Sequence, residues 1–302
     1  MSDERRGYVY GLIAYALWGF FPIYFKLLKP SPPFEILAHR ILWSVLFISL
    51  VLAALRNWGF LRRLRRDRRL LGAITLAGLL IGVNWATYIV GVNSSRVVET
   101  ALGYFIGPLV SVLLGVLMLG ERLRPPQWTA VGLCVVAIVV LVVGYGQVPW
   151  IALLLACSFA TYGLVKKLAG TAAVESMAVE TVVMLLPALA YVVFLEANGT
   201  GTFVSLGVGH TLLLVGGGLV TTVPLLAFAA AAVRIPLATI GLLQYITPTM
   251  QFTFGVLVFR EQMPPERWLG FAIVWLALAL LTFDGLRRNR RPDRLVAGPL
   301  SH

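Results

Sequence analysis

The sequence predicts an all-α integral membrane protein of ten transmembrane helices, arranged as two inverted five-helix repeats. Three observations predict this fold: an apolar composition, ten apolar runs of span length, and a constant offset that aligns the two halves of the chain. Of the 302 residues, 59% are hydrophobic, and the mean hydropathy is +0.87. A soluble protein of this length carries less apolar residue, and the short loops leave no room for a soluble catalytic domain.

Ten apolar runs divide the chain. They lie near residues 7–28, 35–55, 71–92, 98–119, 127–145, 149–168, 174–195, 210–232, 237–258 and 267–285. Each run is predicted to be a helix, because lipid offers no partner to free backbone N–H and C=O groups. The first run is too long for a signal peptide and lacks an obvious cleavage site, so we expect it to be retained as the first span.

The distribution of Lys and Arg predicts the orientation. With the N-terminus inside, the cytoplasmic segments receive 19 of the 25 basic residues and the opposite side receives five, while Arg40 lies within a span. This bias predicts a multi-pass protein of the inner (plasma) membrane with both termini in the cytoplasm. The net charge of +12 is therefore a topology signal, and no nucleic-acid-binding module is visible.

An internal repeat appears when the sequence is shifted by 140 residues. The rarer matches are Glu35/Glu175, Gly78/Gly218, Pro108/Pro248, Gly115/Gly255, Glu121/Glu261, Pro125/Pro265 and Trp128/Trp268. We therefore expect a first repeat over 7–145, a second over 149–287, and a basic cytoplasmic tail over 288–302. Because five is odd, the second repeat enters the membrane from the opposite face, an architecture common in transporters whose solute site lies between the repeats.

Charged residues inside spans are costly and usually face the bundle interior. Arg40 lies in the second run, and its repeat counterpart is Glu180. Each is about 9–12 Å from its entry face at 1.5 Å per residue, so both approach the midplane. One hypothesis is that they line a central cavity in which Arg40 binds a carboxylate or phosphate. The alternative is a structural ion pair between two helices.

Other candidate solute-binding residues surround this pair. His39 adjoins Arg40 and is either a proton relay or a helix–helix hydrogen bond. The remaining candidates are aromatic or amide residues within spans: Trp18, Phe21, Trp43, Asn84, Trp85, Tyr88, Tyr104, Tyr162, Gln244 and Tyr245. Such a set suits an amphipathic or aromatic solute, whereas the plainer interpretation is core packing and interfacial belts.

Prolines and both cysteines also occur within the predicted spans. Pro108 and Pro248 occupy matching repeat positions and Pro224 interrupts another span, so we expect these three to bend helices that gate the solute path. Cys134 and Cys157 each lie in an apolar stretch and are expected to be packing residues. Neither a metal site nor a cofactor is expected.

Several motifs resemble the RarD-type branch of the EamA drug/metabolite transporters. They are His39-Arg40 with Trp43-Ser44, Asn84-Trp85, Leu102-Gly103-Tyr104-Phe105-Ile106, Gly120-Glu121-Arg122, Ser158 to Leu164, Thr221-Thr222-Val223-Pro224-Leu225-Leu226, and Gln244-Tyr245-Ile246. The resemblance covers nearly the whole chain. It implies ten helices, two EamA repeats, cytoplasmic termini, and export or uptake of metabolites or drugs. It carries over no assigned binding residues.

The expected function is secondary transport of a small polar or aromatic solute by alternating access. No Walker-type phosphate loop appears, so ATP is not the direct energy source. Coupling to H⁺ through Glu180, His39 or Glu99 and uncoupled exchange both stay open. The alternatives are a non-transporting helper or sensor protein, which here has no visible output domain, and an intramembrane enzyme, for which no His-Glu-x-x-His or Gly-x-Ser-x-Gly motif appears. The solute, the direction and the oligomeric state are not specified by the sequence.

Overall fold

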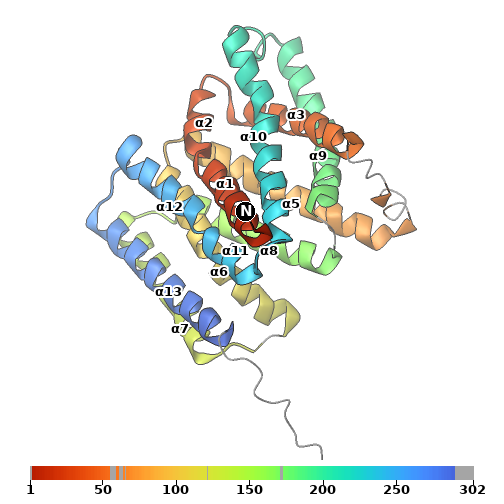
Figure 1. Cartoon of the computed structure of the whole chain (residues 1–302). Helices are drawn as coiled ribbons and strands as arrows, with labels where there is room; N and C mark the ends of the chain where they lie inside the picture. Colours follow the sequence, from red (N-terminus) through yellow and green to blue (C-terminus); the bar gives the residue numbers. More distant parts are fainter. Residues whose placement is uncertain are drawn as a thin grey trace, which may run out of the picture.

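The computed structural model describes residues 2–54, 59, 60, 64, 66–120, 122–170 and 173–289. All regular secondary structure in these residues is helical. Glu121, most of the Arg-rich stretch before residue 66, and the predicted tail beyond residue 289 lie outside the described residues. Figure 1 shows the helices packed into one bundle.

Six helices lie in the described residues of the first half of the chain. They are α1 (Asp3–Gly19), α2 (Phe21–Leu27), α3 (Pro33–Ala54), α5 (Arg68–Asn93), α6 (Val97–Leu119) and α7 (Pro125–Tyr145). Local sequence sets their limits. Asp67 caps α5 by accepting hydrogen bonds from the backbone N–H groups of Arg69 and Leu70, both at 3.0 Å. Gly120 ends α6 with φ of 66°, a left-handed conformation that glycine adopts at no steric cost.

The second half continues with α8 (Trp150–Ala169), α9 (Ala173–Ala197), α10 (Val208–Ala232), α11 (Leu237–Leu243), α12 (Ile246–Thr253), a π-helix (Phe254–Val258) and α13 (Pro265–Asn289). Pro224 lies inside α10, and Pro108 lies inside α6 in the first half. Both helices continue through their prolines.

Nine helical segments in the described part of the chain are long and apolar enough to cross a membrane. These results agree with the predicted all-α membrane protein. The ninth predicted span, 237–258, is present as α11, α12 and the π-helix in succession. The helix is interrupted at Gln244 and Tyr245, which separate α11 from α12, so this span is not one continuous helix of sufficient length. A count of ten spans therefore stays a prediction.

Helices from the two halves of the chain interleave. In Figure 1, α7 and α13 lie side by side along one edge of the bundle. Further contacts between the halves join α6 to α8, α1 to α12, α3 to α10, α5 to α9, α5 to α8, α1 to α10, α3 to α9, and α6 to α12. The largest buried cluster combines α6, α7, α8, α12 and α13. The hydrophobic core is thus built mainly from contacts between residues that are distant in the sequence.

Two glycine positions allow the closest helix contacts around the candidate site. A Cβ added at Gly218 on α10 would lie 2.5 Å from the backbone carbon of Trp43 on α3. A Cβ added at Gly78 on α5 would lie 3.2 Å from the Cα of Glu180 on α9. Small residues at these crossings let the backbones of α3 and α10, and of α5 and α9, approach closely.

Candidate functional site

Arg40 lies on α3, where α10 crosses it. The side chain is buried, with 4% of its surface exposed. Its Nε donates a hydrogen bond of 2.7 Å to Oγ1 of Thr221 on α10. Thr221 in turn donates to the carbonyl oxygen of Gly217, one helical turn earlier, at 2.8 Å. The Thr221 hydroxyl is thereby oriented so that its oxygen accepts from the guanidinium.

Aromatic rings enclose the rest of the Arg40 guanidinium. Its central carbon lies 4.1 Å from the centroid of the Trp85 ring, 5.3 Å from that of Phe21 and 5.6 Å from that of Phe25. These distances allow cation–π attraction, which is strongest for Trp. No carboxylate within the described ranges forms an ion pair with Arg40, and the Nη donors have no hydrogen-bond acceptor there. Within the part of the chain that the structure describes, the Arg40 charge therefore meets aromatic rings and one hydroxyl.

Tyr88 packs against Phe21 and Phe25, two of the rings around this arginine, and Tyr104 and Asn84 follow beyond Tyr88. Asn84 is buried and donates through Nδ2 to the carbonyl oxygen of Leu155 at 3.1 Å and to Oγ of Ser158 at 3.0 Å. Its Oδ1 accepts from the Tyr104 hydroxyl at 3.3 Å. The Tyr88 ring packs 5.8 Å from that of Tyr104, but the Tyr88 hydroxyl has no partner among the described residues. Asn84 therefore joins α5, α6 and α8, whereas Tyr88 keeps a free polar atom.

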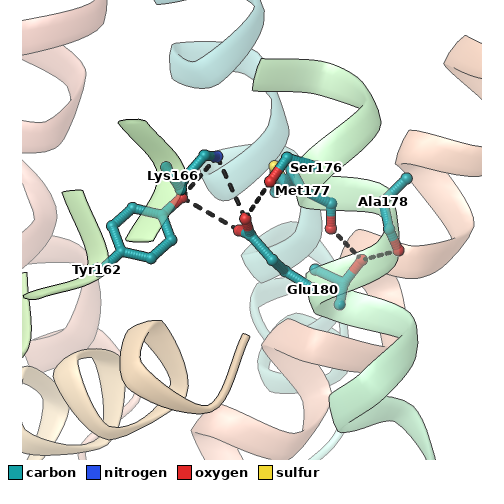
Figure 2. A network of polar contacts seen from close by, with 7 residues as sticks. Tyr162, Lys166, Ser176, Met177, Ala178 and Glu180 are labelled. Carbon is teal, nitrogen blue, oxygen red and sulfur yellow. Dashed lines mark hydrogen bonds and ion pairs between the residues drawn. The ribbon is translucent and has the colours of Figure 1, made fainter. Parts of the chain in front are cut away.

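Glu180 on α9 lies in a different polar cluster, which Figure 2 shows. Its side chain is 3% exposed and forms an ion pair with Lys166 at 3.2 Å. The Tyr162 hydroxyl donates to Oε2 at 3.1 Å, and the Ser176 hydroxyl donates to Oε1. Lys166 also donates to the Tyr162 hydroxyl at 2.9 Å, so α8 and α9 are joined by a closed network of hydrogen bonds. The carboxylate is fully compensated within this network.

The structure does not pair Arg40 with Glu180. The described partner of Glu180 is Lys166, a residue that sequence reasoning counted only as a cytoplasmic charge. The alternative of a structural Arg40–Glu180 ion pair is thus wrong. The cation that pairs with Glu180 is Lys166, which lies one helical turn after Tyr162 on α8. A cavity shared by Arg40 and Glu180 stays a prediction.

His39 and Trp43 form a third group. They lie one helical turn apart on α3, and both contact Phe203 in the linker between α9 and α10. The His39 ring stacks on Phe203 at 4.5 Å between centroids and 17° between planes, while Trp43 lies 6.1 Å away. Neither ring nitrogen of His39, nor Nε1 of Trp43, has a hydrogen-bond partner among the described residues. A helix–helix hydrogen bond through His39 is therefore not formed.

Gln244 and Tyr245 lie at the interruption between α11 and α12. Gln244 is the C-cap of α11, and Tyr245 is the N-cap of α12. Pro248, in α12, follows the interruption by three residues. The structure gives these residues no contact with Arg40. Their participation in solute binding or gating stays a prediction.

Several neighbours of the candidate residues were not singled out from the sequence; besides Lys166 and Phe25, they include Thr221, Phe203 and Ser176. In the sequence, Thr221 stands out only as part of a motif. Its spacing of four residues from Gly217 is compatible with the hydrogen bond that orients its hydroxyl. Phe203 lies in the linker between α9 and α10, and the sequence alone does not show which residues of α3 this linker contacts. Ser176 lies four residues before Glu180, and this helical spacing indicates a contact.

At the bundle end opposite the N-terminal residues, carboxylates cap helices. Glu261 accepts hydrogen bonds from the backbone N–H of Val97 at 2.5 Å and of Val98 at 2.9 Å, at the start of α6. Burial raises the pKa of Glu261, although the two backbone donors, Arg267 and Lys26 act in the opposite direction. Glu99 accepts from the backbone N–H of Ile151 at 3.0 Å and pairs with Arg96 at 2.6 Å.

Metal coordination is not supported by the described side chains. No three His, Cys, Asp or Glu residues among them gather in an arrangement that holds an ion. Cys134 is buried and Cys157 is exposed, and both are free thiols.

Comparisons with known proteins give a consistent result. The model of the EamA-like transporter family matches residues 5–143. A RarD protein of Streptomyces exfoliatus is 56% identical over 290 residues, which cover 96% of this chain and 92% of that protein. An uncharacterised transporter of Pseudomonas aeruginosa is 43% identical, with 96% and 97% covered, and the RarD protein of Escherichia coli K12 is 39% identical, with 97% and 99% covered.

A solved crystal structure is also similar. Its TM-score is 0.59 at 18% sequence identity, and the match covers 94% of this chain and 99% of that chain. At this identity, the likeness concerns the fold alone.

Proposed function

The chain belongs to the RarD branch of the EamA transporter superfamily, and from this premise we propose that it is a secondary transporter whose solute carries a carboxylate or phosphate group bound by Arg40. The solute is a small metabolite or drug with an apolar or aromatic part. A multi-pass membrane protein of this family needs a polar group inside the bundle to recognise its solute, and Arg40 is the group that the described residues leave uncompensated.

The observation that carries the proposal is the environment of Arg40. A guanidinium that is 4% exposed and has no carboxylate partner among the described residues is costly in a membrane span. Its Nη donors are arranged for bidentate hydrogen bonding to a planar anion. A solute carboxylate or phosphate supplies both the missing charge and the missing acceptors. The Arg40 environment therefore supports a functional interpretation over a structural one.

The rings around Arg40 support the apolar part of the solute. Trp85, Phe21 and Phe25 lie against the guanidinium, and Tyr88 offers an unpartnered hydroxyl beside them. A site of this kind, with apolar walls and a few polar groups, binds amphipathic small molecules in a fixed orientation. The Tyr88 hydroxyl is then available to a second polar group of the solute.

The pairing of the helices supports an inverted repeat. Exchanging the two halves of the chain converts the α6–α8 contact into α1–α12, α3–α10 into α5–α9, and α5–α8 into α1–α10. Three further contacts between the halves, α3–α9, α7–α13 and α6–α12, convert into themselves. This exchange is expected of two five-helix repeats related by a two-fold axis, and it favours ten spans. Alternating access then amounts to rocking one bundle against the other.

The interrupted ninth span supports a moving element. This span consists of three short elements, α11, α12 and the π-helix, of 7, 8 and 5 residues. Broken helices of this type occur in transporters where backbone lines a solute path. We infer that Gln244, Tyr245 and Pro248 change conformation during the transport cycle, while Pro108 and Pro224 stay within continuous helices.

The excess of basic residues on one side supports insertion in the inner membrane with both termini in the cytoplasm. The alternatives are a helper or sensor without transport and an intramembrane enzyme. Solute flux into liposomes that contain only this protein separates transport from both.

The test of the Arg40 site is a thermal-shift screen of the purified full chain. Each probe is an aromatic or aliphatic carboxylate or phosphate, matched with its neutral amide or alcohol. A bound probe raises the melting temperature by mass action. We expect charged probes, and not their neutral analogues, to stabilise the protein, and we expect Arg40→Gln to abolish the shift.

The control is Arg234→Gln, which removes one positive charge at a residue paired with Asp3 away from the site. This variant should retain the shift. A shift of equal size in Arg40→Gln and in the unmodified protein contradicts the proposal.

A further inference from the structure

Glu35, at the start of α3, is a buried carboxylate with one unpartnered oxygen. Its side chain has no exposed surface. Oε1 accepts a 2.6 Å hydrogen bond from the backbone N–H of Thr202, in the linker between α9 and α10. Oε2 has no hydrogen-bond partner among the described residues. Glu35 therefore holds this linker through a single charge-assisted hydrogen bond.

The same linker covers one face of α3. Ser31, just before α3, lies within hydrogen-bond distance of Thr202 Oγ1 at 2.5 Å and of His210 Nε2 at 2.7 Å. Phe203, the next residue after Thr202, stacks on His39. Glu35, His39 and Trp43 follow one another at intervals of four residues and so share the helix face that the linker covers. Phe203 also packs against the buried cluster that contains Phe21 and Phe25, two of the rings around Arg40.

The other three buried or partly buried carboxylates described above differ from Glu35. Glu99 has a donor at each oxygen, from Ile151 and Arg96. Glu261 has Val97 and Val98, and both oxygens of Glu180 are engaged in the network of Figure 2. Of these four carboxylates, only Glu35 has an oxygen without a hydrogen-bond donor from the described residues. Protonation of that oxygen therefore breaks no hydrogen bond.

We propose that Glu35 is a proton-binding site, and that proton uptake by its carboxylate releases the linker segment 200–207 from α3. The proton bonds to a carboxylate oxygen and gives a neutral carboxylic acid; no other covalent bond forms or breaks. The hydrogen bond from the Thr202 N–H then loses its charge assistance and becomes roughly half as strong. His39 on α3 and His210 on α10 are the titratable groups that these contacts bring to the cluster, and Arg40 is the adjacent charge.

The consequence for transport rests on the proposed function. Release of the linker opens the α3 face next to Arg40 toward the bundle end that holds Glu35. Proton binding and solute access from that end are then linked, which makes H⁺ the coupling ion and Glu35 its site. Glu180, with both oxygens engaged, is left with a structural role.

The test is amide hydrogen–deuterium exchange of the full chain in lipid nanodiscs over a series of pH values. Each rate is divided by the rate of an unstructured peptide at the same pH. In the unmodified protein, we expect protection of segment 200–207 to fall by roughly tenfold as pH decreases. In Glu35→Gln, which keeps the shape of the protonated acid, we expect low protection at every pH.

The matched control is Glu261→Gln. It should reduce protection at the start of α6 and leave the pH profile of segment 200–207 unchanged. Protection that does not vary with pH in the unmodified protein overturns the proposal, and so does an unaltered profile in Glu35→Gln.

A second variant keeps the test decisive if Glu35→Gln fails to fold. In His210→Gln, a persisting pH profile supports Glu35, and its loss assigns the proton to the imidazole and overturns the proposal. The exchange measurement needs no solute. Its failure is therefore distinct from a failed thermal-shift screen, which concerns Arg40.

Discussion

Arg40 and Glu180 occupy equivalent places in the two halves of the sequence, yet their surroundings are opposite. Glu180 is compensated by Lys166 and by two hydroxyl donors, all supplied by neighbouring turns of α8 and α9. Arg40 meets one hydroxyl and three aromatic rings, none of which carries a charge. Burial is nearly the same for both. The difference teaches that depth in a span identifies a charged residue whose burial is costly. The partners of that residue decide whether the protein itself compensates the charge.

The largest expected effect concerns the Glu180 network. Removing Lys166 as Lys166→Met leaves a buried carboxylate without its cation, and we expect the free energy of unfolding to fall by about 3 kcal/mol. Glu180→Gln should cost less, because the long Lys166 side chain extends toward water when its partner is lost. The measurement is reversible unfolding in mixed detergent micelles.

The double variant closes the thermodynamic cycle. Lys166→Met with Glu180→Gln should recover most of the loss, because no lone charge stays buried. Losses that simply add would show that the two residues act independently, and the contrast with Arg40 would then disappear.

A smaller effect of opposite sign is expected at Arg40. Arg40→Met removes a charge that lacks a carboxylate partner, so stability should be unchanged or higher by about 1 kcal/mol, once the lost attraction to Trp85 is included. The measurement is the same unfolding assay, with Glu180→Met as the matched comparison. If Arg40→Met lowered the free energy of unfolding as much as Lys166→Met does, Arg40 would be a structural residue and would not differ from Glu180.

The smallest effect concerns Glu261, whose carboxylate caps the start of α6 and lies outside the predicted spans. Burial raises its pKa above the ordinary value of 4.5. The folded state therefore binds this proton more tightly than the unfolded state does. The stability that results is present below the ordinary pKa and is lost as pH rises through the raised one. Melting temperature should thus fall more between acid and neutral pH in the unmodified protein than in Glu261→Gln. Parallel curves would contradict this assignment.

Much of the fold followed from the sequence. Apolar runs locate spans well, because a bilayer fixes helix length and forbids unpaired backbone. Two runs are not single helices: 7–28 is interrupted at Phe20, between α1 and α2, and 237–258 is interrupted at Gln244 and Tyr245. Hydropathy does not report a local change of helix type. The sequence signal nearest to the second interruption is Pro248, which follows Tyr245 by three residues and was expected to bend this span.

The burial of the main candidate residues was predictable, whereas their contacts were less so. Burial cost identified Arg40, Glu180 and Asn84. The partner of Glu180 was missed, because a Lys at a span end is ordinarily a topology signal. Phe203 and Thr202 were missed because their linker meets α3 only through tertiary packing, which no periodicity within the linker reports.

The interleaving of the two halves has a consequence for biosynthesis. The first five spans emerge from the ribosome before their main partners exist, and α7 waits for α13, the last helix to be synthesised. Arg40 likewise lacks its Thr221 partner until α10 has been synthesised. Chain release, more than insertion of any one helix, is thus the moment at which the protein can assemble, and a nascent chain stalled before residue 265 should be a substrate for membrane quality control.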